Sequence, residues 1–464
     1  MSREKALTKN VFIIGLGTFL PRLSMVIVLP ILTGYLTKTE FGTFDLINTL
    51  VLLLLPIVTL RIETAAFRFL LECKDINEKK NIVTTMLVYG ITISILALVI
   101  FYVLATEINI LTRAMISLFF FLDTIHVLTL QIVRGFSKNM VFSISAIINS
   151  LIKMSLIVLL VSMLNIGLNG VLIATNVAFV ISIAVNIIGG SIYKYISHKS
   201  FSLGKLKSML QYSWPMVPNS LSYWAMNFSS RLIITAILGI EANAIYAVAN
   251  RIPGLFGSVK LAFGFAWQEN ASLAVKDSDA GEYYGKMFDH VFRIFFGLII
   301  LLIAATPVLF FVLIRGNYTE AYYQMPFLFG AFFFSSISSF LGGIYVAHKR
   351  TLNFGVTTVF AALLSVIINF GLIHVIGLFA ASISTLVGFA FLTIYRMINI
   401  KSFQKIDYKY KTIFLCLGIF AGMGWLLYLN NMVASIINIV VGVFVSIAFN
   451  YKTLREVLKK VKRK

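Results

Sequence analysis

The sequence predicts an all-α polytopic membrane protein, because its apolar residues are gathered in long stretches separated by short polar connections. Of its 464 residues, 59% are hydrophobic and only 12% are charged, a composition typical of chains embedded in lipid. A bilayer core requires roughly 20 apolar residues for each crossing helix. Fourteen stretches approach or exceed that length, so we expect about fourteen transmembrane helices.

The first apolar stretch is too long for a signal peptide and lacks a small-residue cleavage site, so we expect it to remain as the first span. The division near residue 376 depends only on the tight turn that His374 and Gly377 offer, and a count of thirteen or twelve stays open. The predicted spans cover residues 10–36, 41–70, 82–106, 111–133, 140–164, 168–193, 211–238, 242–272, 284–314, 319–346, 353–376, 377–399, 411–429 and 432–451.

A weak internal repeat relates two halves of the chain, in which 36–48 aligns with 238–250 at an offset of 202 residues. Six spans on either side of the polar stretch 194–207 favour two bundles that rock about a central site. Ser202 is expected to cap a short interfacial helix that begins at Leu203. The predicted domains are an N-terminal six-helix bundle at 1–195, a cytoplasmic linker at 196–210, a C-terminal six-helix bundle at 211–400, and two additional helices with a basic tail at 401–464.

The net charge of +21 follows membrane topology rather than a nucleic-acid-binding surface. If the N-terminus is cytoplasmic, most of the 39 Lys and Arg lie in the tails and in every second loop. Only Lys38, Arg113 and Arg315 then lie in loops outside. This is the positive-inside pattern, and it predicts a multi-pass protein of the cytoplasmic membrane with both termini in the cytoplasm.

Several cations lie within the predicted spans, where each costs about 2.5–3.5 kcal/mol at a helix centre. Such positions favour a polar cavity for an anionic substrate, and Arg suits phosphate oxygens well. Snorkelling, ion pairing and structural anchoring are the alternatives at each position, and Lys260 is expected to be structural. The six candidate cavity residues are Arg22, Arg61, Lys153, Arg231, Arg251 and Lys260.

Three acids in the spans, Asp45, Glu63 and Asp123, are candidates for ion coupling. On a straight helix Arg61 and Glu63 would point about 200° apart, so Glu63 is not expected to neutralise its neighbour. Asp123 and His126 share a helix face and either relay protons or form a hydrogen-bonded structural pair. The stripe around Arg231 adds Trp224 and Asn227, which with Asn250 are candidates for sugar contact. Pro253-Gly254 is expected to kink its helix.

The sequence contains no cluster of metal ligands, phosphate-binding loop or nucleophile elbow, so we expect no cofactor, no metal and no enzymatic activity. External loops are also too short to hold a catalytic domain. Several segments do resemble sequence motifs that recur in one transporter family: 39–44 (TEFGTF), 210–219 (LQYSWPMVPN), 250–253 (NRIP) and 263–267 (FGFAW). On these segments the chain resembles the polysaccharide (O-antigen type) flippases of the multidrug/oligosaccharidyl-lipid/polysaccharide exporter superfamily.

The resemblance implies a V-shaped pair of bundles that moves undecaprenyl-pyrophosphate-linked oligosaccharide from the inner to the outer leaflet by alternating access, for surface polysaccharide biosynthesis. It implies a bacterial inner-membrane protein, with Arg22, Arg61 and Arg251 where related lipid II flippases carry cavity arginines. We expect a monomer, with H⁺ or Na⁺ as candidate counter-ions and polysaccharide assembly proteins as candidate partners. The alternatives are a multidrug cation antiporter of the same superfamily and a membrane glycan polymerase or ligase.

Overall fold

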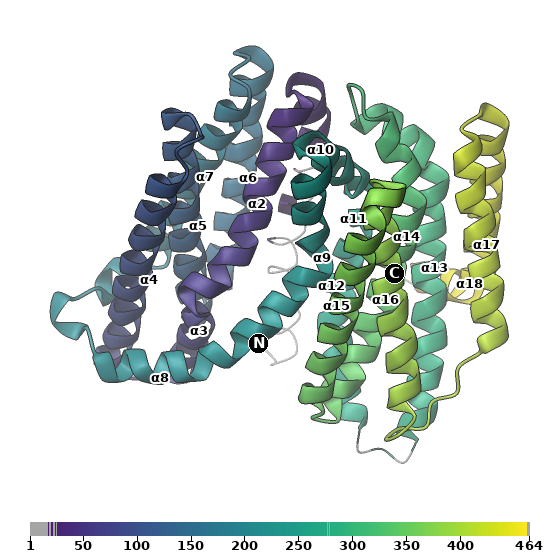
Figure 1. The fold of residues 1–464 in the computed structure, drawn as a ribbon. Helices are drawn as coiled ribbons and strands as arrows, with labels where there is room; N and C mark the ends of the chain where they lie inside the picture. Colours follow the sequence, from purple (N-terminus) through teal and green to yellow (C-terminus); the bar gives the residue numbers. More distant parts are fainter. Residues whose placement is uncertain are drawn as a thin grey trace. The chain divides into compact units, whose positions relative to one another are not determined.

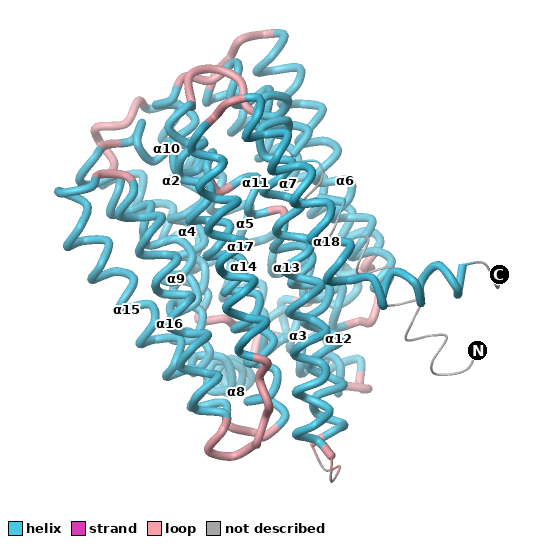
Figure 2. The backbone as a smooth tube through the Cα atoms, turned by 90° about the vertical axis from the view of Figure 1, so that its right-hand side faces the viewer, coloured by secondary structure: helices cyan, strands magenta, loops and turns pink. Residues whose placement is uncertain are grey.

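The computed structural model describes Gly17, Leu20, Pro21, Ser24 and residues 26–461, with the exception of 276 and 278. Arg22 and most of the predicted span 10–36 therefore lie outside the described residues. Within the described residues the protein consists of helices and loops, with no strand (Figure 2). Eleven of these helices are long and apolar enough to cross a membrane, which confirms the predicted fold class.

The count of fourteen spans is not confirmed. Among the described helices, those within the predicted spans 10–36, 211–238 and 242–272 do not reach the required length or hydropathy. The second of these carries a polar stripe and the third is interrupted, whereas the apolar helices Val26–Tyr35 and Ile240–Ala249 are short. The predicted break near residue 376 is confirmed, because one helix ends at Ile376, Gly377 has a φ of 56°, and the next helix begins at Phe379.

The chain divides into two compact units, Met1–Trp224 and Ala225–Lys464, and each is described here by itself. In unit 1 the side chain of Glu40 connects the starts of two helices. Its carboxylate accepts the Thr37 backbone N–H at 3.0 Å in a capping box and the Leu168 N–H at 2.9 Å. It thereby joins the starts of two helices. Gly167 (φ 65°) leaves the room for it, since a Cβ there would lie 2.1 Å from that carboxylate.

Unit 1 contains the helices α2 to α8 and the first part of α9, labelled in Figure 1. Helix α6 ends in a π-helical turn, Val158–Met163. The predicted cap of α8 is confirmed, because the Ser202 hydroxyl accepts the Lys205 N–H at 3.2 Å. The bounds are α2 Lys38–Thr59, α3 Ile62–Glu72, α4 Ile76–Leu104, α5 Ile110–Gly135, α6 Asn139–Ile157, α7 Leu168–Gly189, α8 Leu203–Ser213 and α9 Val217–Leu238.

The interior of unit 1 is apolar where α3, α4, α5 and α8 meet. Ile62, Ile82, Leu128 and Met209 are fully buried there in one cluster. Met209 comes from α8, so this short helix packs one face against α3 and α4. Between membrane-spanning helices such packing stabilises the fold through van der Waals contact rather than through removal of apolar surface from water.

Unit 2 is built around α14, which is the most buried of the membrane-length helices and packs against α10, α12, α13 and α16. Helix α13 lies along α18 (Figure 1). Helix α18 runs to Val461, ten residues beyond the predicted span. The bounds are α10 Ile240–Ala249, α11 Arg251–Gly254, α12 Phe256–Ala274, α13 Ala280–Leu313, α14 Thr319–Ala347, α15 Thr351–Ile376, α16 Phe379–Ile400, α17 Tyr410–Leu429 and α18 Met432–Val461.

Candidate functional site

The predicted span 41–70 is not one helix, and the break lies at a candidate cavity residue. Helix α2 ends at Thr59, and Leu60 and Arg61 adopt left-handed backbone conformations with φ of 48° and 61°. Helix α3 then begins at Ile62. Non-glycine residues rarely adopt such angles, so the break is a costly feature that its surroundings must hold in place.

The break also brings Arg61 and Glu63 together, which corrects the expectation that they would point apart. Their Nη1 and Oε1 atoms lie 3.3 Å apart, and the Glu63 side chain is only 1% exposed. The Thr59 hydroxyl donates to the same carboxylate at 3.1 Å. The expectation was wrong because it assumed the 100° rotation per residue of a continuous helix. Arg61 is one-third exposed, so it bonds the acid and still faces outward.

A second group of charges in unit 1 involves α5 and α6. The amine of Lys153 lies 5.6 Å from the centre of the Phe44 ring, a cation–π contact. Lys153 also interacts electrostatically with Asp123 and His126 of α5. No hydrogen bond joins Asp123 to His126 in the described part of the chain, so the expected structural pair is not observed. The structure instead places Lys153 near both.

The other candidate residues of unit 1 have mixed surroundings. Asp45 is buried at 2% exposed within α2. Trp224 is 9% exposed, and its indole N–H donates to the Thr49 carbonyl at 2.9 Å, so it anchors the first part of α9 on α2. Sugar contact by Trp224 stays a prediction. Its indole N–H already donates a hydrogen bond within the protein.

In unit 2 the helix is divided on both sides of the predicted kink at Pro253-Gly254, although the dividing residues Asn250 and Leu255 keep right-handed helical backbone angles. The segment forms three successive pieces, α10, α11 and α12, which are separated at Asn250 and Leu255. Arg251 is the first residue of α11 and is partly exposed. The Asn250 side-chain amide donates to the Tyr246 carbonyl at 2.8 Å, which holds the end of α10. Pro253 has no N–H to donate to the Ala249 carbonyl, so one helical hydrogen bond is missing beside Arg251.

The remaining candidates of unit 2 lie on α9 and α12. The Arg231 guanidinium lies 5.2 Å from the Phe228 ring on the same helix, and Asn227 is partly exposed beside them. The Lys260 amine donates to the Ser335 hydroxyl of α14 at 2.8 Å. This bond between two helices agrees with the structural role expected of Lys260.

Sequence reasoning did not single out Arg396, which is the most buried arginine of the described chain at 2% exposed. Its guanidinium donates to the Ser338 carbonyl of α14 at 2.8 Å. It also donates to the Phe354 carbonyl and the Thr357 and Thr358 hydroxyls of α15, and lies over the Phe354 ring at 4.4 Å. A cation near the end of a span resembles a surface anchor in sequence, and no local signal reveals carbonyl and hydroxyl partners on other helices.

The arrangement in both units suits electrostatic binding of an anion rather than metal chemistry. In each unit the candidate cations lie at helix boundaries or on polar stripes of helices. No group of three or more His, Cys, Asp and Glu side chains that could hold a metal ion occurs among the described residues.

The family model for polysaccharide biosynthesis proteins matches residues 7–263, which is more than half of the chain. The chain belongs to this family. The match spans unit 1 and continues into α12, so it includes both backbone breaks and all six candidate cations. None of the curated proteins matches the sequence significantly.

Solved transporter structures share the fold of this family member. The lipid II flippase MurJ in an inward closed conformation has a TM-score of 0.72 at 14% identity, with 96% of this chain and 100% of that chain covered. A multidrug resistance MATE family transporter of the MOP superfamily, in an inward-facing conformation, has a TM-score of 0.63 at 15% identity and coverages of 87% and 96%. A MOP superfamily transporter from Pyrococcus furiosus has a TM-score of 0.60 at 15% identity, with 86% of this chain and 96% of that chain covered. These likenesses establish a MOP-type fold.

Proposed function

We propose that this protein is a flippase that moves a polyprenyl-pyrophosphate-linked oligosaccharide from the inner to the outer leaflet of the cytoplasmic membrane by alternating access. The observation that supports the proposal most directly is the set of cations on helices and at helix boundaries in a member of the polysaccharide biosynthesis family; of these, Lys153 lies on a helix that is long and apolar enough to cross a membrane. A pyrophosphate carries the charge that repays the cost of keeping arginine at this depth.

The breaks in the backbone support the same function. Non-helical backbone at membrane depth persists where it borders protein or a polar cavity. Arg61 lies at such a break in unit 1, and Arg251 of unit 2 follows Asn250, where the helix is divided without leaving right-handed helical angles. In the proposed mechanism the pyrophosphate meets Arg61 and Arg22 first, and Arg251 and Arg231 later, while the polyprenyl tail stays in lipid. Asp45, Glu63 and Asp123 are the candidate acids for coupling to H⁺ or Na⁺, and the surroundings of Asp123 allow a structural role to be tested against this one.

The likeness to MATE family structures raises drug export as a second candidate. A carrier of cationic drugs would need acidic groups in excess along its path, whereas five of the six candidate positions lie among the described residues as cations. The identity is too low to carry the substrate across from those transporters. The flippase is therefore the better supported of the two functions, and no catalytic step is part of it.

The experiment measures surface polysaccharide in a deletion strain complemented with wild type, Arg22→Gln, Arg251→Gln or the control Lys74→Gln. Lys74 is exposed between α3 and α4 and lies outside the spans. We expect wild type and the control to restore the polysaccharide. The two arginine variants should leave lipid-linked precursor in the inner leaflet at normal protein abundance. Intact polysaccharide in the deletion strain would refute the substrate, and full restoration by both arginine variants would refute the cationic site.

A further inference from the structure

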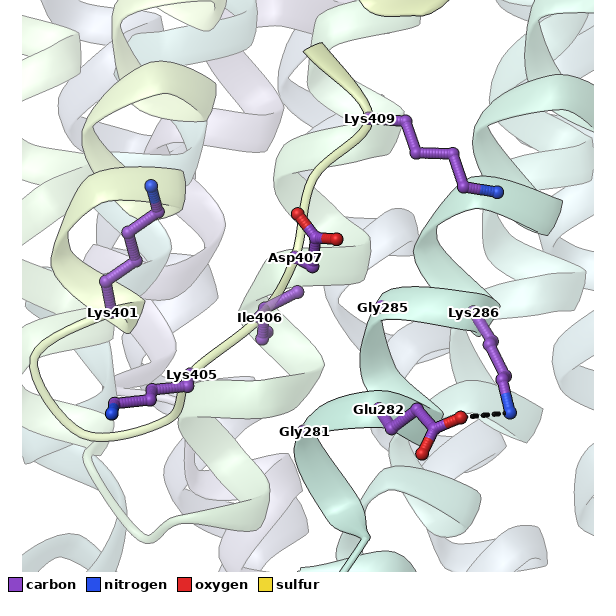
Figure 3. A pocket seen from close by; sticks show the side chains of 9 residues that line it. All are labelled: Gly281, Glu282, Gly285, Lys286, Lys401, Lys405, Ile406, Asp407 and Lys409. Carbon is purple, nitrogen blue, oxygen red and sulfur yellow. Dashed lines mark ion pairs between the residues drawn. The ribbon is translucent and has the colours of Figure 1, made fainter.

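A cavity of about 700 Å³ lies at the end of unit 2 where α13 begins and α16 ends. One wall is the first two turns of α13, and the other is the segment 401–409, which leads from α16 to α17 (Figure 3). The charge distribution of the sequence predicts that this end faces the cytoplasm. The candidate transport residues line none of it, so the cavity is separate from the site described above.

The two walls are held together by close backbone contact. A Cβ at Gly281 would lie 2.3 Å from the Lys405 carbonyl oxygen, so only glycine permits this approach. Ile406 and Tyr408 are buried, and the Tyr408 ring lies 4.9 Å from the ring of Phe288 of α13. The segment is thus a packed part of the fold rather than a loose loop.

This packing leaves alternate side chains of the segment exposed, and the buried Ile406 also lines the cavity. Because Ile406 and Tyr408 point inward, their neighbours Lys405, Asp407 and Lys409 are exposed. An extended chain places successive side chains on opposite sides, which accounts for the alternation. The cavity is consequently lined by polar side chains on a backbone that the core holds in place.

Two of the four lysines that line the cavity are already paired with acids. Lys286 forms an ion pair with Glu282 one turn earlier on α13, and Lys409 lies 2.9 Å from the carboxylate of Asp289. Figure 3 shows the first pair on the α13 side of the cavity. These pairs leave little charge for a ligand on that side.

The other two lysines lie on the opposite side of the cavity and have no carboxylate partner among the described residues (Figure 3). The Lys401 amine donates to the Tyr410 hydroxyl at 2.9 Å, which orients its charge without neutralising it. The Lys405 amine has neither an ion pair nor a hydrogen bond in the described part of the chain. Asp407 is the one acid that segment 401–409 contributes to the lining, so this side retains an excess of positive charge.

The two helices that segment 401–409 connects expose apolar side chains near their ends. On α16, Ile394 and Ile398 are 54% and 65% exposed, and Ile398 lies only three residues before Lys401. On α17, Phe414 and Leu415 are 70% and 58% exposed. A soluble phosphate compound has no apolar part to contact such a surface, whereas the acyl chains of a lipid pack against it.

We propose that this cavity binds the phosphate headgroup of an anionic phospholipid, with Lys401 and Lys405 as the phosphate contacts and the acyl chains along α16 and α17. Basic pockets between helix ends on the cytoplasmic side of a membrane suit such headgroups. The same phosphate chemistry could come from a soluble compound, and the experiment distinguishes the two sources. The proposal is independent of the transported substrate.

The test measures lipid retention by the full-length purified protein with native mass spectrometry, using phosphatidylglycerol and phosphatidylcholine as probes. Lys401→Gln/Lys405→Gln is compared with Lys401→Arg/Lys405→Arg and with the control Lys199→Gln/Lys207→Gln, which removes two exposed lysines near α8. We expect phosphatidylglycerol affinity to fall on the order of 30-fold in the first variant, because each lysine near the membrane contributes about 5-fold. The arginine variant and the control should bind as wild type does.

Equal phosphatidylglycerol retention by the glutamine variant and its control would overturn the proposal. Inorganic pyrophosphate provides the second arm: if it binds with the same dependence on Lys401 and Lys405 while phosphatidylglycerol does not, the ligand is a soluble phosphate compound and the lipid assignment is wrong. Should the double variant fail to fold, Lys405→Gln carries the test alone with a roughly 5-fold loss, since its exposed amine bonds no described residue.

Discussion

The guanidinium of Arg61 and the carboxylate of Glu63 form an ion pair of 3.3 Å across the left-handed break between α2 and α3. Glu63 is buried and Arg61 is one-third exposed, so the pair joins the interior of unit 1 to a more open surface. The Thr59 hydroxyl binds the same carboxylate from the end of α2. One acid therefore holds both sides of the break.

Removing either member of this pair should destabilise the protein unequally. Arg61→Gln leaves a buried carboxylate without its cation, whereas Glu63→Gln leaves an arginine that can turn to solvent. We expect Arg61→Gln to cost about 1–2 kcal/mol, discounted for the exposure of Arg61, and the double variant to cost less than the sum. Unfolding of the four proteins in detergent, followed by intrinsic fluorescence, measures this. Strict additivity would show that the pair contributes nothing to stability.

The sequence was a good guide wherever a local signal exists. Hydrophobic length located the eleven membrane-length helices, Ser202 marked the start of α8, and the glycine at 377 and Pro253-Gly254 marked two breaks. Each of these depends on the residue itself or on its near neighbours. The same kind of reasoning therefore works where the capping or breaking residue is itself a Ser, Gly or Pro.

Features without a local sequence signal could not be predicted. Neither glycine nor proline occurs at the Leu60–Arg61 break, so no residue there signals a positive φ. The Arg61–Glu63 ion pair and Thr59 stabilise the break instead. Arg396 has the sequence context of a surface anchor, yet its partners come from two other helices. The surroundings of Lys153 likewise involve α2 and α5. Tertiary packing decides the last two, whereas the break at Leu60–Arg61 has near partners but no residue that by itself favours a positive φ.

Arg396 should be essential for the stability of unit 2. Its guanidinium satisfies acceptors on α14 and α15 at once, and a lysine amine cannot reproduce that planar set of donors. We expect Arg396→Gln to lower the free energy of unfolding by about 2–4 kcal/mol and Arg396→Lys to recover only part of it. Thermal unfolding in detergent tests this against Lys411→Gln, which removes an exposed charge. Wild-type stability in Arg396→Gln would contradict the structural role.

Two glycines in neighbouring helices should respond oppositely to alanine. A Cβ at Gly343 would lie 2.6 Å from the ring of Trp267, which is buried and donates to the Phe340 carbonyl at 2.7 Å. Gly343→Ala should therefore displace the indole and cost about 1–3 kcal/mol. Gly355→Ala meets nothing within 4 Å and should stabilise α15 by roughly 0.5–1 kcal/mol. Unfolding midpoints of both variants measure the contrast, and a loss of the same size in each would disprove it.

The stability of unit 2 should decrease in mild acid because of His348. Burial, and then the charge of Arg350, lower the pKa of this histidine below its ordinary value. The folded state therefore favours the neutral ring, so its contribution is present above pH ~6.5, the unfolded value, and is lost as the pH falls toward the folded pKa. Unfolding temperatures at pH 7 and pH 5 should differ more in wild type than in His348→Gln. An unchanged difference in the variant would exclude His348 as the cause.

The proximity of Lys153 to Asp123 decides between two roles for the acid. If Lys153 is its permanent counter-charge, Lys153→Gln leaves a carboxylate in an apolar bundle, and Asp123→Asn in the same chain removes the problem. The double variant should then be more stable than Lys153→Gln alone, with a coupling of about 1–2 kcal/mol, and should regain surface polysaccharide. If Asp123 instead carries a counter-ion, Asp123→Asn alone abolishes export and the double variant stays inactive. Asp123→Asn combined with Lys74→Gln, a distant exposed lysine, is the control and should be additive. We expect the rescue, because Lys153 already supplies next to Asp123 the positive charge that a counter-ion would bring.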